Sequence, residues 1–165
     1  MNDIERNIDS TTIKKIWLLL AKVCDPEVPV LTILDLGIVR EVKLNGGQVE
    51  VVITPTYSGC PAMDAISIDI RFTLIEHGFT NIKITSVLSP AWTTDWMTEA
   101  GKRKLKEYGI APPSRSARGD DADLIICPQC QSGNTKLLSQ FGSTACKALH
   151  QCNDCKEPFD YFKCH

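Results

Sequence analysis

The sequence predicts an α+β fold, in which a small mixed helix/sheet domain precedes a short cysteine-rich module. Before residue 109, segments with the apolar spacing of helices are interspersed with segments that alternate as strands do. Residues 110–123 are rich in proline, serine and charged side chains, which is typical of a linker. Six of the eight cysteines follow this stretch. We therefore expect domains at residues 1–109 and 124–165, joined by a linker at 110–123.

The composition is that of an ordinary globular protein, with 43% hydrophobic and 23% charged residues. A formal net charge of −2 argues against a chain built to grip nucleic-acid backbones. The sequence contains no apolar run long enough to span a bilayer. Its polar first nine residues are unlike a secretory signal. We expect a cytoplasmic protein that binds neither nucleic acid nor membrane.

A first helix is predicted from about residue 9 or 10 to residue 23, because apolar residues recur on one face there. Pro26 and Pro29 follow closely and forbid a regular helix. Asp25 and Glu27 therefore stand on a constrained loop. A pair of solvated turn residues is the plainer alternative to a functional role for these two carboxylates.

A β-hairpin is predicted next, with strands at 38–44 and 48–54 joined by Asn45-Gly46-Gly47, a strong signal for a tight turn. A helix follows at 61–77, ended by Gly78. Residues 81–88 alternate as a third strand, and a last helix is expected at 95–108. The apolar residues predicted to form the buried face of the helix at 61–77 are Ala62, Ala65, Ile66, Ile68, Phe72, Leu74 and Ile75.

The loop between the hairpin and this helix holds a cysteine in a distinctive place. Cys60 precedes Pro61, and proline is favoured at the first position of a helix. Unpaired backbone N–H groups and the helix dipole stabilise an anion at such a start. A thiol there tends to have a lowered pKa and to react or bind metal as thiolate. The first domain is thus predicted to present Cys60.

An enzymatic role for Cys60 is disfavoured because a cysteine nucleophile needs a base. His77 ends the very helix that Cys60 begins, about 25 Å away at helical rise. His150 and His165 belong to the C-terminal module and would have to fold back onto Cys60. No serine–histidine–aspartate pattern, phosphate loop or dinucleotide fingerprint is present.

The C-terminal module carries two Cys-x2-Cys pairs about twenty residues apart, which is a strong signal for a metal site. The predicted ligands are Cys127, Cys130, Cys152 and Cys155. Four thiolates in a closed site favour structural Zn²⁺, although iron in a rubredoxin-like site or a cluster has similar spacing. Cys146 and Cys164 are the alternative ligands if this set is wrong. So short a segment needs a metal to supply its folding free energy.

Three motifs together resemble the domain shared by SufT-type and cytosolic iron–sulfur targeting proteins: residues 25–29, residues 35–39, and residues 54–61 with Cys60-Pro61. Residues 89–96, with two tryptophans that either roof the core or line a contact surface, extend the likeness. So do residues 141–149, the cysteine pairs and residues 162–164. From about residue 10 onward, the chain resembles the PaaD (also called PaaJ) family, accessory proteins of the bacterial phenylacetyl-CoA ring 1,2-epoxidase.

The resemblance implies an α+β iron–sulfur-assembly-like domain with a zinc ribbon, and a role in aerobic phenylacetate degradation. That epoxidase has a di-iron oxygenase and a reductase carrying flavin and a [2Fe–2S] centre. Cys60 matches the family's reactive cysteine, which would handle iron or an iron–sulfur cluster transiently. Asp25, Glu27 and Asp35 match its acidic motif positions.

The resemblance therefore favours a non-catalytic maturation factor whose partners are the oxygenase and reductase subunits of the epoxidase. A structural or regulatory subunit of the same complex, in which Cys60 is only a capped thiol, is the alternative. Formation of a homo-oligomer stays open.

Overall fold

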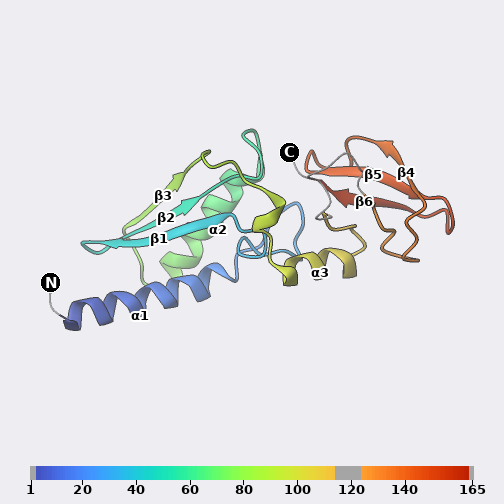
Figure 1. The fold of residues 1–165 in the computed structure, drawn as a ribbon. Coiled ribbons are helices and arrows are strands. Elements are labelled where there is room, and N and C mark those ends of the chain that lie inside the picture. The colour runs from blue at the N-terminus through green and yellow to red at the C-terminus, as the bar shows by residue number, and fades with distance from the viewer. Residues whose placement is uncertain (1–2, 114–123, 164–165) are drawn as a thin grey trace. The chain divides into compact units, whose positions relative to one another are not determined.

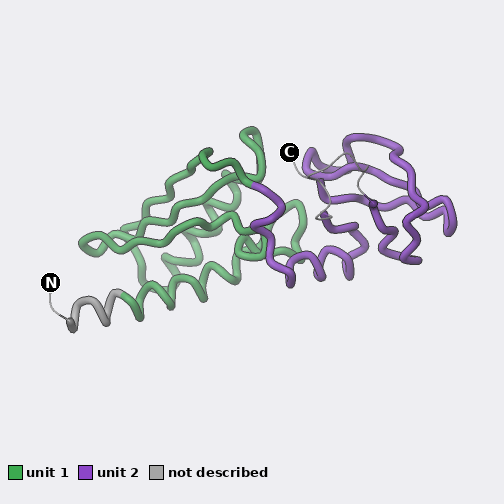
Figure 2. Tube along the Cα trace, viewed as in Figure 1, with its two compact units in different colours: residues 1–92 green, residues 93–165 purple. Residues whose placement is uncertain are grey.

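The computed structural model describes residues 3–113 and 124–163, with side-chain surroundings from residue 10 onward. The chain divides into two compact units, residues 1–92 and residues 93–165, shown in different colours in Figure 2. Residues 114–123 of the linker predicted at 110–123 lie outside the described residues, as do Cys164 and His165. The domain limits expected from the sequence stay a prediction.

The first unit is a three-stranded sheet with two helices (Figure 1). Its elements are α1 (Asp3–Leu20), β1 (Val39–Asn45), β2 (Gln48–Ile53), α2 (Ala62–Glu76) and β3 (Ile82–Ser86). β1 and β2 form the expected hairpin, and both Gly46 and Gly47 have positive φ, at 55° and 85°. β3 pairs in parallel with β2, with α2 as the crossover. The helix α1 begins earlier than expected, at Asp3.

The core of this unit lies between the helices and one face of the sheet. The alternating residues Val49, Val51 and Ile53 of β2 are buried, while the residues between them are half-exposed. On the half-exposed face, Glu50 accepts a hydrogen bond from Thr85 at 2.6 Å and pairs with Lys83 at 2.8 Å. The single-face alternation predicted for this strand is confirmed.

The buried face of α2 differs from the expected one. The structure buries Ala62, Ile66, Ile70 and Leu74, which follow a spacing of four residues. Three other apolar side chains on α2, which were predicted to be buried, are 64%, 61% and 55% exposed: Ile68, Phe72 and Ile75. Ala62, Ile66 and Leu74 are buried as predicted. The prediction was wrong for the three exposed residues because α2 is apolar on two sides, and sequence periodicity alone does not say which side meets the sheet.

The second unit joins a short helical segment to an antiparallel sheet. Its elements are a 3-10 helix η1 (Thr94–Trp96), α3 (Glu99–Glu107), β4 (Thr135–Ser139), β5 (Lys147–Cys152) and β6 (Pro158–Phe162). α3 is shorter than expected because Thr98 caps it, its hydroxyl accepting from the N–H of Gly101 at 2.9 Å. Ala111 is buried and forms a bridge with Tyr161, so the segment after α3 joins the sheet.

Candidate functional site

Cys60 lies in the turn that connects β2 with α2. Its backbone N–H donates to the carbonyl of Tyr57 at 3.1 Å, which closes a tight turn before the helix. The helix begins at Ala62, with Pro61 as the N-cap residue and without a capping side chain. Cys60 therefore lies just before the helix, and its side chain is half-buried.

The loop that carries the acidic residues is packed into the first unit rather than solvated. Asp25 is 8% exposed, and its Oδ1 accepts hydrogen bonds from the backbone N–H groups of Glu27 (2.7 Å) and Val28 (2.8 Å). The N–H of Asp25 donates to the carbonyl of Leu31 at 2.8 Å. The Asp25 carboxylate thus fixes the loop backbone, because it satisfies two N–H groups of a segment that cannot be helical.

Asp35 has a comparable local role in the following turn. Its Oδ2 accepts from the backbone N–H of Thr32 at 3.0 Å and from the Thr32 hydroxyl at 2.9 Å. The Thr32 hydroxyl in turn accepts from the N–H of Asp35 at 3.0 Å. The turn is covered by Trp92, which is buried and donates from Nε1 to the Leu36 carbonyl at 2.8 Å. Of the two tryptophans in the 89–96 segment, Trp92 therefore closes the core.

The carboxylates of the acidic loop influence the pKa of the Cys60 thiol. Burial is the main cause that raises the pKa of the Cys60 thiol above its ordinary value. A hydrogen bond from the Ala62 N–H and one from the Thr56 hydroxyl oppose this, while the carboxylates of Glu27 and Asp25 raise the pKa further. The lowered pKa expected for a cysteine at a helix start is therefore wrong. Desolvation and two acidic side chains outweigh the helix start.

This setting disfavours a free thiolate but suits a thiolate that binds a cation. A metal ion would replace the proton and would be attracted by the same carboxylates that repel a bare thiolate. His77 offers no base here, since it caps the far end of α2, where its Nδ1 lies 2.8 Å from the Thr73 carbonyl. Burial and the two carboxylates therefore make the surroundings of Cys60 unfavourable for an activated nucleophile.

A second cluster lies in the second unit, where the two Cys-x2-Cys turns meet. The Sγ atoms of Cys127 and Cys155 are 3.8 Å apart, and those of Cys130 and Cys152 are 3.5 Å apart. All four sulfurs lie within 4.8 Å of one another. Four thiolates about 2.3 Å from a tetrahedral metal would be roughly 3.8 Å apart, so the donor set fits such an ion.

The backbone of each turn is shaped to hold thiolates. The residue after the second cysteine of each pair has a positive φ, 64° at Gln131 and 68° at Lys156. The next N–H groups, of Ser132 and Glu157, donate to the sulfurs of Cys130 and Cys155. In the same way the Cys155 N–H is the main cause that lowers the pKa of Cys152 to about 7. N–H groups aimed at sulfur stabilise the charged form that a metal needs.

Polar side chains that were not predicted from the sequence tie the two turns together. Asp154, between the second pair of cysteines, accepts from the Ser132 hydroxyl and from the Asn134 side chain at 2.9 Å. These bonds hold the pKa of Asp154 below its usual range, with Ser132 the larger cause. The signal available in the sequence was the run of Ser, Asn and Asp beside the cysteines, since such residues favour turns.

Cys146, one of the two alternative ligands, is not part of this cluster. Cys146 is buried, and its Sγ lies 3.0 Å from the Thr144 hydroxyl. It is not among the four cysteines that gather, and Cys164 lies outside the described residues. Within the part of the chain that the structure describes, no helix combines the length and apolarity needed to cross a membrane.

Comparison with known proteins defines the class of both units. Residues 13–76 match the family described as "Iron-sulfur cluster assembly protein", and residues 111–163 match the "PaaD zinc beta ribbon domain". The protein is thus an iron–sulfur cluster assembly domain followed by a zinc ribbon.

The chain belongs to the PaaD family, as its likeness to a curated relative shows. It is 50% identical over 153 residues to an Escherichia coli protein that is named as one subunit of a "Putative 1,2-phenylacetyl-CoA epoxidase". The match covers 92% of this chain and 93% of that protein.

Two further relatives match the first part of the chain. A Porphyromonas gingivalis "Fe-S protein maturation auxiliary factor" is 36% identical over 89 residues, covering 53% of this chain and 84% of that protein. A Bacillus anthracis crystal structure of a "Domain of Unknown Function DUF59" has a TM-score of 0.57 at 25% identity and covers 61% of this chain and 96% of that one. The expected α+β fold of the first domain is confirmed.

Proposed function

We propose that this protein is a cytoplasmic maturation factor for a multicomponent phenylacetyl-CoA 1,2-epoxidase, in which Cys60 holds iron or an iron–sulfur cluster during transfer. The setting of Cys60 is the main support for this proposal. In an iron–sulfur cluster assembly domain, a half-buried thiol at the start of α2 lies within electrostatic reach of the carboxylates of Glu27 and Asp25. The name of the Escherichia coli relative supports the epoxidase as the client.

The proposed transfer is an exchange of ligands without a change of redox state. Cys60 loses its thiol proton as it binds iron, and the nearby carboxylates favour the added positive charge. A single protein thiolate leaves other positions on iron open for the ligands of a partner. When a partner's thiolate or carboxylate replaces Cys60, the cysteine regains a proton and the cargo leaves.

The four-cysteine centre has a separate, structural role in this proposal. Cys127, Cys130, Cys152 and Cys155 would bind Zn²⁺, which suits a closed site of four thiolates. Bound zinc would supply folding free energy to the small sheet of β4 to β6. We assign no catalytic step to either site.

Co-expression tests the proposal directly. The oxygenase and reductase subunits are produced with the wild-type protein, with Cys60→Ala or with Cys24→Ala, an exposed thiol of the same unit, as the matched control. We expect Cys60→Ala to stay folded but to lower epoxidase activity and the iron content of the oxygenase or reductase, while the control matches wild type. Normal iron and activity with Cys60→Ala would rule out delivery through this thiol.

A second function, that of a structural or regulatory subunit, is favoured by a different observation. The exposed stripe of Ile68, Phe72 and Ile75 on α2 is the kind of surface that permanent assemblies cover. Removal of the protein from a mature epoxidase separates the two functions. A maturation factor can be removed without loss of activity, whereas a required subunit cannot.

A further inference from the structure

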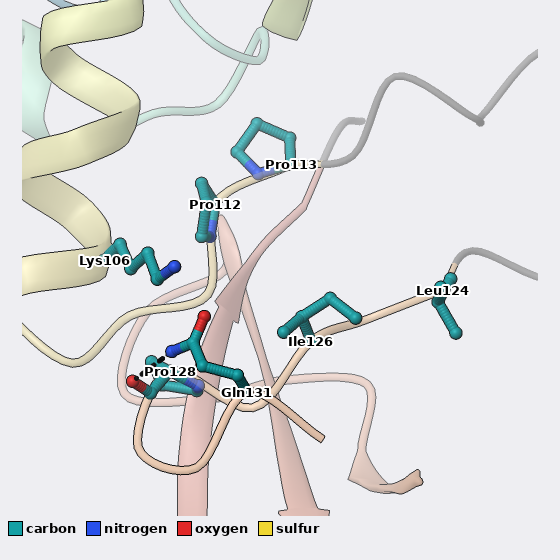
Figure 3. Close-up of a pocket in the computed structure, with 7 residues that line it drawn as sticks. All are labelled: Lys106, Pro112, Pro113, Leu124, Ile126, Pro128 and Gln131. Carbon is teal, nitrogen blue, oxygen red and sulfur yellow. Dashed lines mark hydrogen bonds between the residues drawn. The ribbon is translucent and has the colours of Figure 1, made fainter. Parts of the chain in front are cut away.

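A groove in the second unit, between α3 and the first cysteine turn, is not used by either candidate site. It consists of two hollows of about 310 Å³ and 530 Å³, which share Lys106 and Pro128 as lining residues. We call it the α3–knuckle groove. Figure 3 shows the first hollow, with Lys106 reaching in from α3 on one side and Leu124 and Ile126 on the opposite side.

One side of the groove is apolar and held in place by the chain. The first hollow is lined by Pro112, Pro113 and Pro128 together with Leu124 and Ile126. Leu124 is 61% exposed and Ile126 is 36% exposed, so both side chains are open to a partner.

Gly133 lies close to both of these side chains. A Cβ at Gly133 would lie 2.9 Å from Leu124 Cδ1 and 3.6 Å from Ile126 Cδ1. A larger residue at that position would shift the end of the exposed Leu124 side chain and so change the apolar side of the groove.

The other side of the groove is basic. Arg103 and Lys106 are three residues apart on α3 and therefore share a face, and both are exposed. Lys106 lines both hollows, and Arg103 and Glu107 line the second. Among the described residues, neither cation has an ion pair or hydrogen bond, whereas Lys102 on the same helix pairs with Glu99 at 3.2 Å.

Amide groups complete the groove. Gln131 Nε2 donates to the Pro128 carbonyl at 3.1 Å, drawn as a dashed line in Figure 3, and Gln129 lines the second hollow. The surface therefore offers an apolar floor beside two cations that have no ion-pair partner in the part of the chain that the structure describes. This combination is complementary to an apolar side chain that neighbours a carboxylate.

We propose that the α3–knuckle groove docks a segment of the epoxidase oxygenase or reductase that carries an acidic residue beside an apolar one. The inference rests on the proposed function, which makes those subunits the partners. A nucleic-acid strand fits the groove less well, because the floor has aliphatic and proline side chains instead of aromatic platforms for bases.

The test measures binding of the full-length, zinc-loaded protein to the purified oxygenase and reductase subunits by titration calorimetry. Lys106→Glu reverses the charge of the cation that lines both hollows, and Ile126→Asp places a charge on the apolar side of the groove. Lys136→Glu and Leu138→Asp, at exposed positions of β4 outside the groove, are controls with the same changes of charge and polarity. Circular dichroism and one zinc per chain verify that each variant is folded.

We expect both groove variants to raise the dissociation constant at least tenfold. The dissociation constants of the two controls should stay within twofold of the wild-type value. Lys106→Glu should also flatten the dependence of affinity on salt, because a steering charge is lost. Wild-type binding that the groove variants leave unchanged would overturn the groove assignment alone. Failure of the wild type to bind either subunit would overturn the partnership as well. An oligonucleotide is titrated in the same way. If the wild-type protein binds the oligonucleotide but neither subunit, the choice of a protein partner is overturned.

Discussion

The Asp25 carboxylate should be the main support of the loop that faces Cys60, and its removal gives a defined loss of stability. Asp25→Ala leaves the N–H groups of Glu27 and Val28 without their acceptor in a buried loop. Each lost bond of this kind costs about 1–3 kcal/mol, so we expect a loss of roughly 3 kcal/mol in the free energy of unfolding. Asp25→Asn keeps an acceptor oxygen without the charge and should lose about half as much.

Urea unfolding followed by tryptophan fluorescence measures this effect. Two of the three tryptophans, Trp17 and Trp92, lie in the first unit, and Trp96 lies at the start of the second, so the fluorescence reports mainly on the first unit. With a denaturant slope of about 1.5–2 kcal/mol/M, the midpoint should fall by roughly 1.5–2 M for Asp25→Ala. Glu41→Ala is the control, because its pair with Lys43 is exposed and should contribute little. A midpoint that Asp25→Ala leaves within about 0.3 M of wild type would refute the role of this carboxylate in holding the loop.

Three other predictions concern the sites and the fold. Glu27→Gln removes a carboxylate that raises the pKa of Cys60, so alkylation of Cys60 by iodoacetamide at pH 7.5 should become faster; an unchanged rate would place Glu27 out of reach. Cys127→Ser should lose one metal per chain and the circular dichroism of the folded ribbon, while Cys146→Ser keeps its metal. Retained metal in the first variant would mean that the ligand set is wrong. Phe72→Ala should cost less than about 0.5 kcal/mol in thermal unfolding, because Phe72 is 61% exposed, against about 3–5 kcal/mol for a buried phenylalanine.

The parts of the fold that depend on local chemistry were predictable. The turn at residues 45–47 needs positive φ at its centre, and glycine meets that need cheaply. The two Cys-x2-Cys turns carry their geometry in their spacing, and the structure gathers the four expected sulfurs. The iron–sulfur assembly and zinc-ribbon domains were predictable from short motifs, each of which spans only a few consecutive residues.

The features that depend on tertiary contacts were not predictable in the same way. Cys60 and Glu27 are 33 positions apart, so their coupling, and the raised pKa of the thiol, appear only when the loop folds against the start of α2. The choice between two apolar faces of α2 is likewise made by the sheet rather than by periodicity. The α3–knuckle groove joins side chains from α3 and from the cysteine turn, and no single motif encodes it.

Metal analysis of anaerobically purified protein is the most direct test of whether Cys60 is a ligand for iron. Wild type and Cys60→Ala are expressed in iron-replete cells, and their zinc and iron contents per chain are compared. We expect one zinc in both proteins, with iron bound to the wild type and absent from Cys60→Ala. Equal iron in the two proteins, or loss of zinc together with iron in the variant, would contradict this expectation.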